Sequence, residues 1–380
     1  MDRPLTRVAV LGSTGSIGCQ TLDVIRAHPG RFQVTGLTAW SNVDLLAKQV
    51  GEFKPRLVAC LDHAALAGRL SSPPASASLA EIACDPEVDI VVAGVVGRQG
   101  LEPVLQALEC GKTVALANKE AMVMAGPLLR AAAEQGGGSI RPVDSEHSAI
   151  WQCLAGEDPS RVRRLVLTAS GGALRDYPLA ALAGVTTDQV LAHPTWQMGR
   201  KITVDSATLV NKGLEVIEAR WLFDVAFDRI EVVMHRESIV HSLVELTDGS
   251  VKAQLSCPDM RLPIQYALCY PERPALAADP LDFERLGALH FEALDLERYP
   301  CLSLALGAGV RGGTYPAALA AADEEAVRAF LDGRIRFLDI SALLADTLQH
   351  YAGDDDVSLE AVLEADAWGR KFASAWIEGR

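Results

Sequence analysis

Residues 7–18 of this chain read RVAVLGSTGSIG, an apolar run that leads through three glycines into a helical pattern. The run 7–11 predicts a buried strand, and residues 17–27 predict the helix that follows it. Glycines at such a turn let the backbone approach a pyrophosphate, which the free N–H groups of the helix N-terminus can then bind. Because these glycines lie between a strand and a helix, they favour dinucleotide binding over an ordinary turn.

The alternation of strands and helices continues outward from this motif to about residue 144. We predict further strands at 33–39, 57–60, 90–93, 113–117 and 140–143, and helices at 43–53 and 101–109. Such alternation is typical of a parallel sheet covered by helices on both faces. The fold class is therefore α/β, with an N-terminal Rossmann-like, doubly wound parallel sheet over residues 1–144.

Two further domains and a connector are expected after residue 144. Residues 145–274 are interpreted as a central α+β catalytic domain with a mostly antiparallel sheet, whose strands are predicted at 164–168, 230–233, 242–246 and 251–254. Asp248-Gly249 between the last two strands is a hairpin signal. Residues 275–300 are richer in proline and aspartate and are predicted to be a connector. Residues 301–380 are predicted to form a small C-terminal helical domain, with helices over 317–331 and 340–348.

The composition limits the partners that this chain can have. Of its 380 residues, 49% are hydrophobic and 22% are charged, and the net charge is −14. An acidic surface disfavours nucleic acid and anionic membranes as partners, and no apolar run is long enough to span a bilayer. The N-terminus lacks the apolar core of a signal peptide, and the eight cysteines are scattered singly. We therefore expect a cytoplasmic protein with reduced thiols. An anionic substrate would need a local cationic pocket.

The end of the second strand indicates which dinucleotide is preferred. Enzymes that use NAD usually place an acidic residue there, to bind the ribose hydroxyls. Here the segment reads Thr38-Ala39-Trp40-Ser41-Asn42, and the first acid, Asp44, comes later, inside the next helix. Ser41 and Asn42 can donate hydrogen bonds to a 2′-phosphate, which favours NADP(H). The alternative is that they form a plain polar loop.

Three acids are candidates for a metal site. Asp144 and Glu146 follow the strand 140–143 and, two residues apart in extended chain, point the same way at the carboxyl edge of the sheet. A hard cation such as Mg²⁺ or Mn²⁺ would relieve their repulsion. Helix capping at residues 147–154 explains this segment about equally well. The third acid, Glu215, shares a helical face with Asn211, in a helix predicted to be capped by Ser206 or Asp205. A solvated helix surface is the alternative there.

Other segments suggest a phosphate pocket and a lid. A strand ends in Ala169-Ser170-Gly171-Gly172, which can form an anion-binding nest or an ordinary turn. Ser206, Asn211 and Lys212 would complete a cationic pocket. Trp196 and Met198 lie in an irregular stretch, residues 192–200, and fit either a lid over a ligand or permanent packing on the core. Lys119 follows a strand and could stabilise developing negative charge.

Together these segments resemble the 1-deoxy-D-xylulose 5-phosphate reductoisomerase family over essentially the full chain. They fall in the family's order and at its intervals, and the matching segments are 12–18, 118–120, 144–147, 169–172, 193–199, 206–215, 256–261 and 333–340. The resemblance implies NADPH- and metal-dependent isomerisation and reduction of 1-deoxy-D-xylulose 5-phosphate to 2-C-methyl-D-erythritol 4-phosphate, in the non-mevalonate route to isoprenoids. It also implies a homodimer and inhibition by fosmidomycin.

The resemblance further implies a role for individual residues. Asp144, Glu146 and Glu215 would hold Mg²⁺, Mn²⁺ or Co²⁺. Substrate contacts would come from Lys119, Ser145, Glu146, Ser170, His193, Ser206, Asn211, Lys212 and Glu215, with the phosphate held chiefly by Ser170, Ser206, Asn211 and Lys212. Lys119, Glu146 and His193 would be catalytic. Contacts to NADPH would come from Thr14, Gly15, Ser16, Ile17, Asn118, Glu120 and Gly199, beside Ser41 and Asn42. Trp196 and Met198 would belong to a flexible flap.

Two segments depart from the family pattern. Relatives commonly have Ala-Gly-basic-Asn where this chain has Ala39-Trp40-Ser41-Asn42, so the contacts to the 2′-phosphate are altered. Relatives usually have Asn-Ala-Ala-Asn-Glu where this chain has Ala320-Ala321-Ala322-Asp323-Glu324, which predicts a change in packing or capping. Two rival functions remain open from the residues alone. One is a metal-free dehydrogenase that uses Lys119 or His193 as its acid–base group, and the other is a regulator that senses NADP(H).

Overall fold

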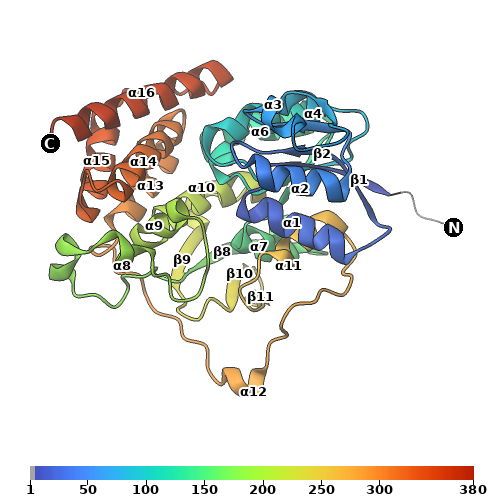
Figure 1. Cartoon of the computed structure of the whole chain (residues 1–380). Coiled ribbons are helices and arrows are strands. Elements are labelled where there is room, and N and C mark those ends of the chain that lie inside the picture. Colours follow the sequence, from blue (N-terminus) through green and yellow to red (C-terminus); the bar gives the residue numbers. More distant parts are fainter. Residues whose placement is uncertain (1–4) are drawn as a thin grey trace. The chain divides into compact units, whose positions relative to one another are not determined.

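The computed structural model describes residues 5–380, which divide into two compact units (Figure 1). The first unit contains residues up to 121, residues 128–148 and residues 259–278. The second unit contains residues 122–127, 149–258 and 279–380. Each unit combines segments that are far apart in the sequence.

The first unit is built on a seven-stranded parallel sheet with the strand order β4-β3-β2-β1-β5-β6-β7. Its strands are β1 (Thr6–Leu11), β2 (Phe32–Thr38), β3 (Leu57–Ala59), β4 (Ala75–Ser76), β5 (Ile90–Ala93), β6 (Thr113–Leu116) and β7 (Ser139–Pro142). Residues 8–11 of the central strand β1 are completely buried, as a strand covered on both faces requires. The predicted doubly wound sheet is confirmed, except that the short strand β4 was not predicted.

Helices connect these strands, and the predicted ones are present. They are α1 (Ser16–Ala27), α2 (Val43–Phe53), α3 (His63–Ala67), α4 (Leu79–Ala83), α5 (Leu101–Glu109), α6 (Lys119–Gly136) and α7 (Ser145–Leu154). Helix α6 is kinked at Ala125, two residues before Pro127. Helices α3 and α4 have only five residues each, too short to show a helical period.

The second unit contains a mixed sheet with the strand order β11-β10-β8-β9. Strand β10 (Val240–Leu246) runs antiparallel to β8 (Val162–Ala169) and to β11 (Val251–Leu255), whereas β9 (Ile230–Met234) is parallel to β8. The sheet is thus mostly antiparallel, as predicted, and Gly249 in the β10–β11 turn has a φ of +87°. The remaining helices of this unit are α8 (Thr187–Leu191), α9 (Arg200–Thr208), α10 (Val210–Phe223), α12 (Phe283–Leu286), α13 (Pro300–Arg311), α14 (Tyr315–Leu331), α15 (Phe337–His350) and α16 (Leu359–Glu378).

The units are divided differently from the predicted domains. Helix α11 (Arg261–Cys269) was expected in the catalytic domain but belongs to the first unit, because Ile264 and Leu268 pack into the core that surrounds β1 and α1. The C-terminal helices form one unit with the central sheet. There, α10 and α13 approach so closely that a Cβ at Gly213 would overlap the Ala305 side chain. Gly213 therefore permits a close contact between these two helices.

The predicted helix start at Ser206 or Asp205 is wrong. Both residues lie inside α9, and α10 begins at Val210 after Leu209, which adopts a left-handed conformation with a φ of +57°. This turn separates two helices that the sequence pattern had merged into one. Helix α10 has an apolar stripe, since Val210, Leu214 and Ile217 are completely buried.

Candidate active site

The glycine-rich loop of the first unit has the features of a nucleotide-binding turn. Gly12 has a φ of +82°, and a Cβ there would lie 2.7 Å from the carbonyl oxygen of Gly94. A Cβ at Gly18 would overlap the backbone of Gly12 and Ser13, so this glycine lets α1 pack closely on β1. Helix α1 has no side-chain cap and no acidic residue in its first turn. No side-chain cap occupies its first N–H groups, and a helix N-terminus of this kind is suited to bind a pyrophosphate.

The segment after β2 carries no acidic charge that would repel a 2′-phosphate. Asn42 caps α2 through a hydrogen bond from the Leu45 N–H to its side-chain oxygen, at 3.2 Å. The nearest acid, Asp44, forms an ion pair with Arg69 at 2.5 Å. Ser41 is exposed, and the side chain of Trp40 is 60% exposed. This pattern fits NADP(H) better than NAD(H).

Asn118 and Glu120 are both buried at the start of α6. The Asn118 side-chain oxygen accepts the Ala121 N–H at 2.9 Å, and its amide nitrogen donates to the carbonyl oxygens of Val95 and Gly97 at 2.6 and 2.9 Å. Asn118 therefore fixes the loop that follows β5. This loop lies at the carboxyl edge of the sheet, where open α/β sheets bind ligands.

A carboxylate pair lies at the same edge, where β7 leads into α7. Ligand oxygens of Asp144 and Glu146 lie within 4.8 Å of one another. Lys119 Nζ lies 2.8 Å from Asp144 Oδ2, and the Ser145 hydroxyl donates to Glu146 Oε2 at 2.5 Å. Asp144 also accepts the Ser145 N–H at 2.9 Å, so it stabilises the start of α7 as well. The first unit therefore brings Lys119, Asp144, Ser145 and Glu146 together.

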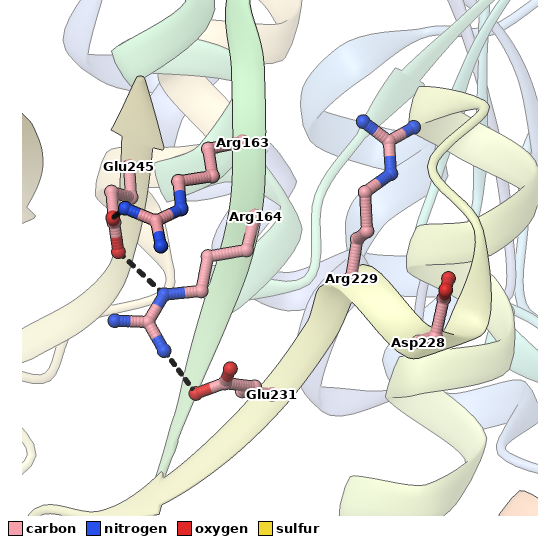
Figure 2. Close-up of a pocket in the computed structure, with 6 residues that line it drawn as sticks. All are labelled: Arg163, Arg164, Asp228, Arg229, Glu231 and Glu245. Carbon is pink, nitrogen blue, oxygen red and sulfur yellow. Dashed lines mark hydrogen bonds and ion pairs between the residues drawn. The ribbon is translucent and has the colours of Figure 1, made fainter. Parts of the chain in front are cut away.

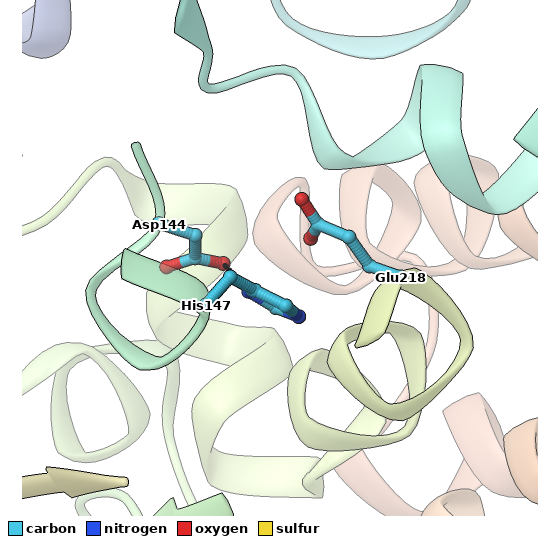
Figure 3. Close-up of side chains that lie close together, drawn as sticks. All are labelled: Asp144, His147 and Glu218. Atoms are coloured by element: carbon cyan, nitrogen blue, oxygen red, sulfur yellow. Dashed lines mark ion pairs between the residues drawn. The ribbon is translucent and has the colours of Figure 1, made fainter. Parts of the chain in front are cut away.

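His147 is a buried neighbour of this pair that the sequence had not singled out for a role. His147 lies in the first turn of α7 and is completely buried, and its Nδ1 lies 3.8 Å from Asp144 Oδ2. Figure 3 draws both side chains. His147 follows directly after a segment rich in polar residues. No sequence period distinguishes it from a surface histidine, and only its complete burial makes it notable.

In the second unit, Glu215 is a buried carboxylate held by two neighbours on α10. The Asn211 amide donates to its Oε1, and the Lys212 ammonium pairs with its Oε2. Glu215 is 1% exposed and Lys212 is 4% exposed, so this face is not the solvated surface that the sequence left open. Both oxygens of this buried carboxylate are therefore in charge-assisted contacts.

The turn that follows β8 packs directly on the end of α9. Gly171 and Gly172 have φ values of +79° and +67°, and a Cβ at Gly172 would lie 2.6–2.8 Å from the backbone of Ser206 and Ala207. The Ser170 hydroxyl oxygen accepts the Gly172 N–H at 3.2 Å. Two residues that the sequence assigned to phosphate binding, Ser170 and Ser206, therefore come from adjoining backbone segments.

His193 has its protonation state fixed by its hydrogen bonds. Its Nδ1 accepts the N–H groups of Thr195 and Trp196 at 3.2 and 3.0 Å, so the proton of the neutral ring must be on Nε2. Nε2 lies 3.0 Å from Ser170 Oγ and therefore donates to it. Burial, followed by the charge of Arg175, lowers the pKa of His193 to about 4. Ser170 thus accepts two hydrogen bonds and has its own proton left to donate.

The irregular stretch 192–199 is anchored at several points within the second unit. The Trp196 and His241 ring centroids lie 6.0 Å apart, and the Thr195 hydroxyl lies 3.3 Å from that of Ser238. Trp196 and Met198 are both partly exposed, and Gly199 provides the N-cap of α9. The residues predicted to form a lid are thus neither part of the core nor fully in solvent.

Sequence reasoning missed Arg175 and His241. The Arg175 guanidinium donates to the carbonyl oxygens of Ser170 and Arg236 at 2.9 and 3.0 Å, which adds positive charge at the Ser170 turn. His241 Nε2 lies 2.9 Å from Ser256 Oγ, and the His241 ring is tilted against that of Trp196. Arg175 lies in an irregular loop, and His241 lies on a strand where alternation predicts only a buried side chain. Neither position therefore has a local sequence pattern that would indicate a functional role.

A separate cavity of about 360 Å³ lies on the central sheet and contains none of the predicted site residues. Figure 2 shows Arg164 between Glu245 and Glu231, with ion-pair distances of 2.5 and 2.6 Å, and Arg163 lies 2.8 Å from Glu245. These arginines are neutralised by their neighbours. The charged residues that line the cavity therefore form a balanced ion-pair network, so the cavity does not form an anion site.

Among the residues 5–380, no helix is long and apolar enough to cross a membrane.

Three family models match the chain in succession. The model described as 1-deoxy-D-xylulose 5-phosphate reductoisomerase matches residues 8–126. The model of that enzyme's C-terminal domain matches residues 140–223, and a DXP reductoisomerase C-terminal domain model matches residues 255–372.

Similar proteins extend over nearly the full length. The 1-deoxy-D-xylulose 5-phosphate reductoisomerase of Geobacillus sp. (strain WCH70) is 52% identical and covers 96% of this chain and 98% of its own. That of Heliobacterium modesticaldum is 52% identical and covers 99% of both chains. A crystal structure of DOX-P reductoisomerase with NADPH, fosmidomycin and magnesium is 42% identical, with a TM-score of 0.94 over 98% of both chains. The Zymomonas mobilis enzyme with NADPH is 42% identical, with a TM-score of 0.92 over 99% of this chain and 100% of that one.

Proposed function

Because this chain belongs to the 1-deoxy-D-xylulose 5-phosphate reductoisomerase family, we infer that it catalyses the NADPH- and divalent-metal-dependent conversion of 1-deoxy-D-xylulose 5-phosphate to 2-C-methyl-D-erythritol 4-phosphate. This reaction supplies isoprenoid precursors. The observation that carries the inference is the Asp144–Glu146 carboxylate pair beside Lys119, at the sheet edge of a nucleotide-binding unit. A nucleotide sensor needs no such pair, and a metal-free dehydrogenase has no use for it.

The metal ligands proposed are Asp144, Glu146 and Glu215. All three offer carboxylate oxygens, the donors that Mg²⁺ and Mn²⁺ prefer. The two acids of the first unit lie close enough to repel each other, and Lys119 compensates part of their charge through its ion pair with Asp144. The Glu215 carboxylate contacts the Asn211 amide and the Lys212 ammonium group. The donor set therefore fits a hard divalent cation, with Co²⁺ as a further possibility.

The proposed NADPH contacts lie mainly in the first unit. The loop residues Thr14 and Gly15 and the uncapped first turn of α1, which contains Ser16 and Ile17, would receive the pyrophosphate. Ser41 and Asn42 would receive the 2′-phosphate, since Asp44 is paired with Arg69. Asn118 and Glu120 would contact NADPH at the carboxyl edge of the sheet, and Gly199 would contact it from the start of α9.

The proposed phosphate site lies in the second unit. The Ser170 hydroxyl has its proton left to donate, because His193 and Gly172 already donate to its oxygen. Ser206 lies on the backbone segment that packs against Gly172. Asn211 and Lys212 would add an amide and an ammonium group. In this proposal His193 acts on the substrate through Ser170, and its neutral ring makes it a positioning group that does not transfer protons at neutral pH.

The proposed chemistry divides between bound groups and side chains. The metal ion supplies Lewis acidity at the ketose oxygens, and NADPH supplies the hydride. Glu146 accepts the proton of a substrate hydroxyl, and its geometry is fixed by the hydrogen bond from Ser145. Lys119, held beside Asp144, stabilises negative charge on a substrate oxygen. Trp196 and Met198 would exclude water from this chemistry.

The metal assignment is tested with Glu215→Gln, which keeps the size of the side chain and removes its charge. We expect metal-dependent oxidation of NADPH by 1-deoxy-D-xylulose 5-phosphate to fall by at least about 100-fold, with NADPH affinity nearly unchanged. The matched control is Glu231→Gln, a change to an ion-paired carboxylate of β9 outside the site. Full activity in Glu215→Gln, or full activity after thorough chelation, would contradict the metal assignment.

A homodimer in the cytoplasm is also proposed from the family resemblance. The prediction is a particle of twice the 40.6 kDa chain mass, measured by light scattering at micromolar concentration. We further propose that fosmidomycin competes with the sugar phosphate, since a relative's structure contains this inhibitor together with magnesium. The absence of competition in steady-state kinetics would contradict this proposal.

A further inference from the structure

A buried lysine bridge fixes α9 in the second unit. Lys201 Nζ lies 2.7 Å from Asp205 Oδ2 and 2.7 Å from Asp323 Oδ2. Asp205 lies one turn further along α9, whereas Asp323 lies in the middle of α14. The two aspartate side chains are 2% and 0% exposed. Carboxylates this deeply buried need a cation, so one ammonium group ties the two helices together.

Most of the buried side chains of α9 are polar. Only Ile202, Val204 and Ala207 of its nine residues are apolar, and much of its buried surface comes from polar side chains such as Thr203 and Thr208. Apolar packing therefore contributes less to its position than it does for an ordinary buried helix. The polar bridge adds to the contacts that hold this helix, among them the close packing of the Gly172 turn on Ser206 and Ala207.

A third helix adjoins the bridge. Cys301 of α13 is buried, and burial first, then the charges of Asp323 and Asp205, raise the pKa of its thiol. Helices α9, α13 and α14 are also in contact with one another. The bridge is thus located where α9, α13 and α14 meet.

Both ends of α9 carry residues of the proposed substrate site. The stretch that contains Trp196 and Met198 leads directly into its first turn, and Ser206 lies in its last turn. The Gly172 turn contacts Ser206 so closely that no Cβ would fit between them. Any shift of α9 therefore changes the spacing between Ser206 and Ser170.

We propose that Lys201 is a positioning residue for the substrate phosphate, which holds α9 and therefore Ser206 against the Ser170 turn by bridging Asp205 and Asp323. The inference rests on the proposed function, in that Ser170 and Ser206 bind the phosphate. Lys201 itself touches neither the substrate nor the cofactor. Its loss weakens phosphate binding while the nucleotide loop of the first unit is unchanged.

The test is steady-state kinetics of the full chain with Lys201→Met. We expect KM for 1-deoxy-D-xylulose 5-phosphate to rise by about 10- to 100-fold, whereas KM for NADPH changes by less than about twofold. Asp323→Asn, which removes one charge of the bridge and keeps its shape, raises the substrate KM less. The double variant Lys201→Met/Asp323→Asn has a KM no higher than that of Lys201→Met, because both changes remove the same contact. Lys201→Arg restores part of the affinity.

Two controls separate the possible causes. Lys252→Met breaks a more exposed ion pair with Glu157 in the same unit and leaves the substrate KM unchanged. If Lys201 had a merely structural role, its replacement would lower the folded fraction and the maximal rate but would leave the substrate KM unaltered. If Lys201→Met does not fold, the positioning role is tested with Asp323→Asn and Lys201→Arg. In these variants too, the change in KM for 1-deoxy-D-xylulose 5-phosphate is compared with the change in KM for NADPH.

The outcomes for the two proposals are distinguishable with Ser206→Ala. If Ser206→Ala raises the substrate KM while Lys201→Met and Asp323→Asn do not, the positioning role of Lys201 is overturned and the phosphate site stands. If Ser206→Ala leaves KM unchanged, the phosphate site itself is overturned.

Discussion

The hydrogen bonds around Ser170 illustrate how single residues prepare this site. His193 is held as a neutral ring because two backbone N–H groups occupy its Nδ1 and because burial lowers its pKa to about 4. Its remaining proton is donated to Ser170 Oγ. The Ser170 hydroxyl proton is thereby left to donate a hydrogen bond to a phosphate oxygen, which can only accept one.

This arrangement predicts a dependence of stability on pH. The pKa of His193 is about 4 in the folded chain, below its ordinary value of 6.5. As the pH falls from 6.5 to 4, the unfolded chain takes up a proton that the folded chain does not, so stability is fully present above 6.5 and is lost through that window. In His193→Asn the free energy of unfolding should decrease less steeply over the same range, as measured by urea denaturation at several pH values.

The control for this measurement is His290→Asn. His290 is a largely exposed histidine of the same unit, with a side chain that is 66% exposed, and its replacement accounts for the loss of an imidazole as such. If the free energy of unfolding fell equally steeply with pH in the parent chain and in His193→Asn, the assignment of a buried neutral ring to His193 would be contradicted.

At the scale of elements, the close contact between α10 and α13 gives a direct prediction. A Cβ at Gly213 would overlap the Ala305 side chain, so Gly213→Ala must push the two helices apart. We expect a loss of about 1–3 kcal/mol in the free energy of unfolding. The matched control is Gly307→Ala on α13, where no atom lies within 4 Å of the new Cβ and the change should add up to about 1 kcal/mol. If both variants lost the same stability in urea denaturation, the contact would have no special role.

Elements with a strong local pattern were the ones that the sequence predicted. The buried strand 7–11 and the helices 43–53 and 101–109 have a clear period, and each is present within a residue or two. The division between α9 and α10 was missed because it depends on Leu209 alone, a leucine in a left-handed conformation that a side chain with a Cβ disfavours. Such a conformation is imposed by tertiary packing and leaves no mark on the local composition.

The candidate site was predictable to a similar extent. Asp144, Glu146 and Ser170 follow strands at sheet edges, and this placement makes them conspicuous in the sequence. The burial of Lys212 and Glu215 was not predictable, because Asn, Lys and Glu on a helix usually face solvent. Arg175 and Lys201 act through partners that are distant in sequence or in irregular segments, and only the folded chain brings these partners together.

At the scale of the whole molecule, neither unit is a continuous segment of chain. Helix α11 lies more than a hundred residues beyond β7, yet its Ile264 and Leu268 belong to the core of the first unit. It is also joined to that unit by hydrogen bonds from Arg141 to the Ala267 carbonyl oxygen and between His28 and Gln265, at 2.7 and 2.6 Å. The first unit is therefore incomplete until the chain has reached α11.

This organisation predicts how a fragment will behave. A fragment that ends at residue 144, the boundary suggested by the sequence, lacks α11 and exposes the apolar surface that α11 covers. We expect it to unfold without a cooperative transition and to bind NADPH at least about tenfold more weakly than the full chain. Calorimetry and fluorescence titration measure these two properties. A fragment with the affinity of the full chain would show that α11 is dispensable for the nucleotide fold.

The uncapped start of α1 has a consequence for how long the protein survives in a cell. Its first N–H groups have no side-chain acceptor, and a bound pyrophosphate provides one. A ligand that binds only the folded chain lowers the population of opened molecules, which are the ones that proteases degrade. We therefore expect the abundance of this enzyme to follow the total supply of the nicotinamide dinucleotide, oxidised and reduced together, because both forms carry the pyrophosphate.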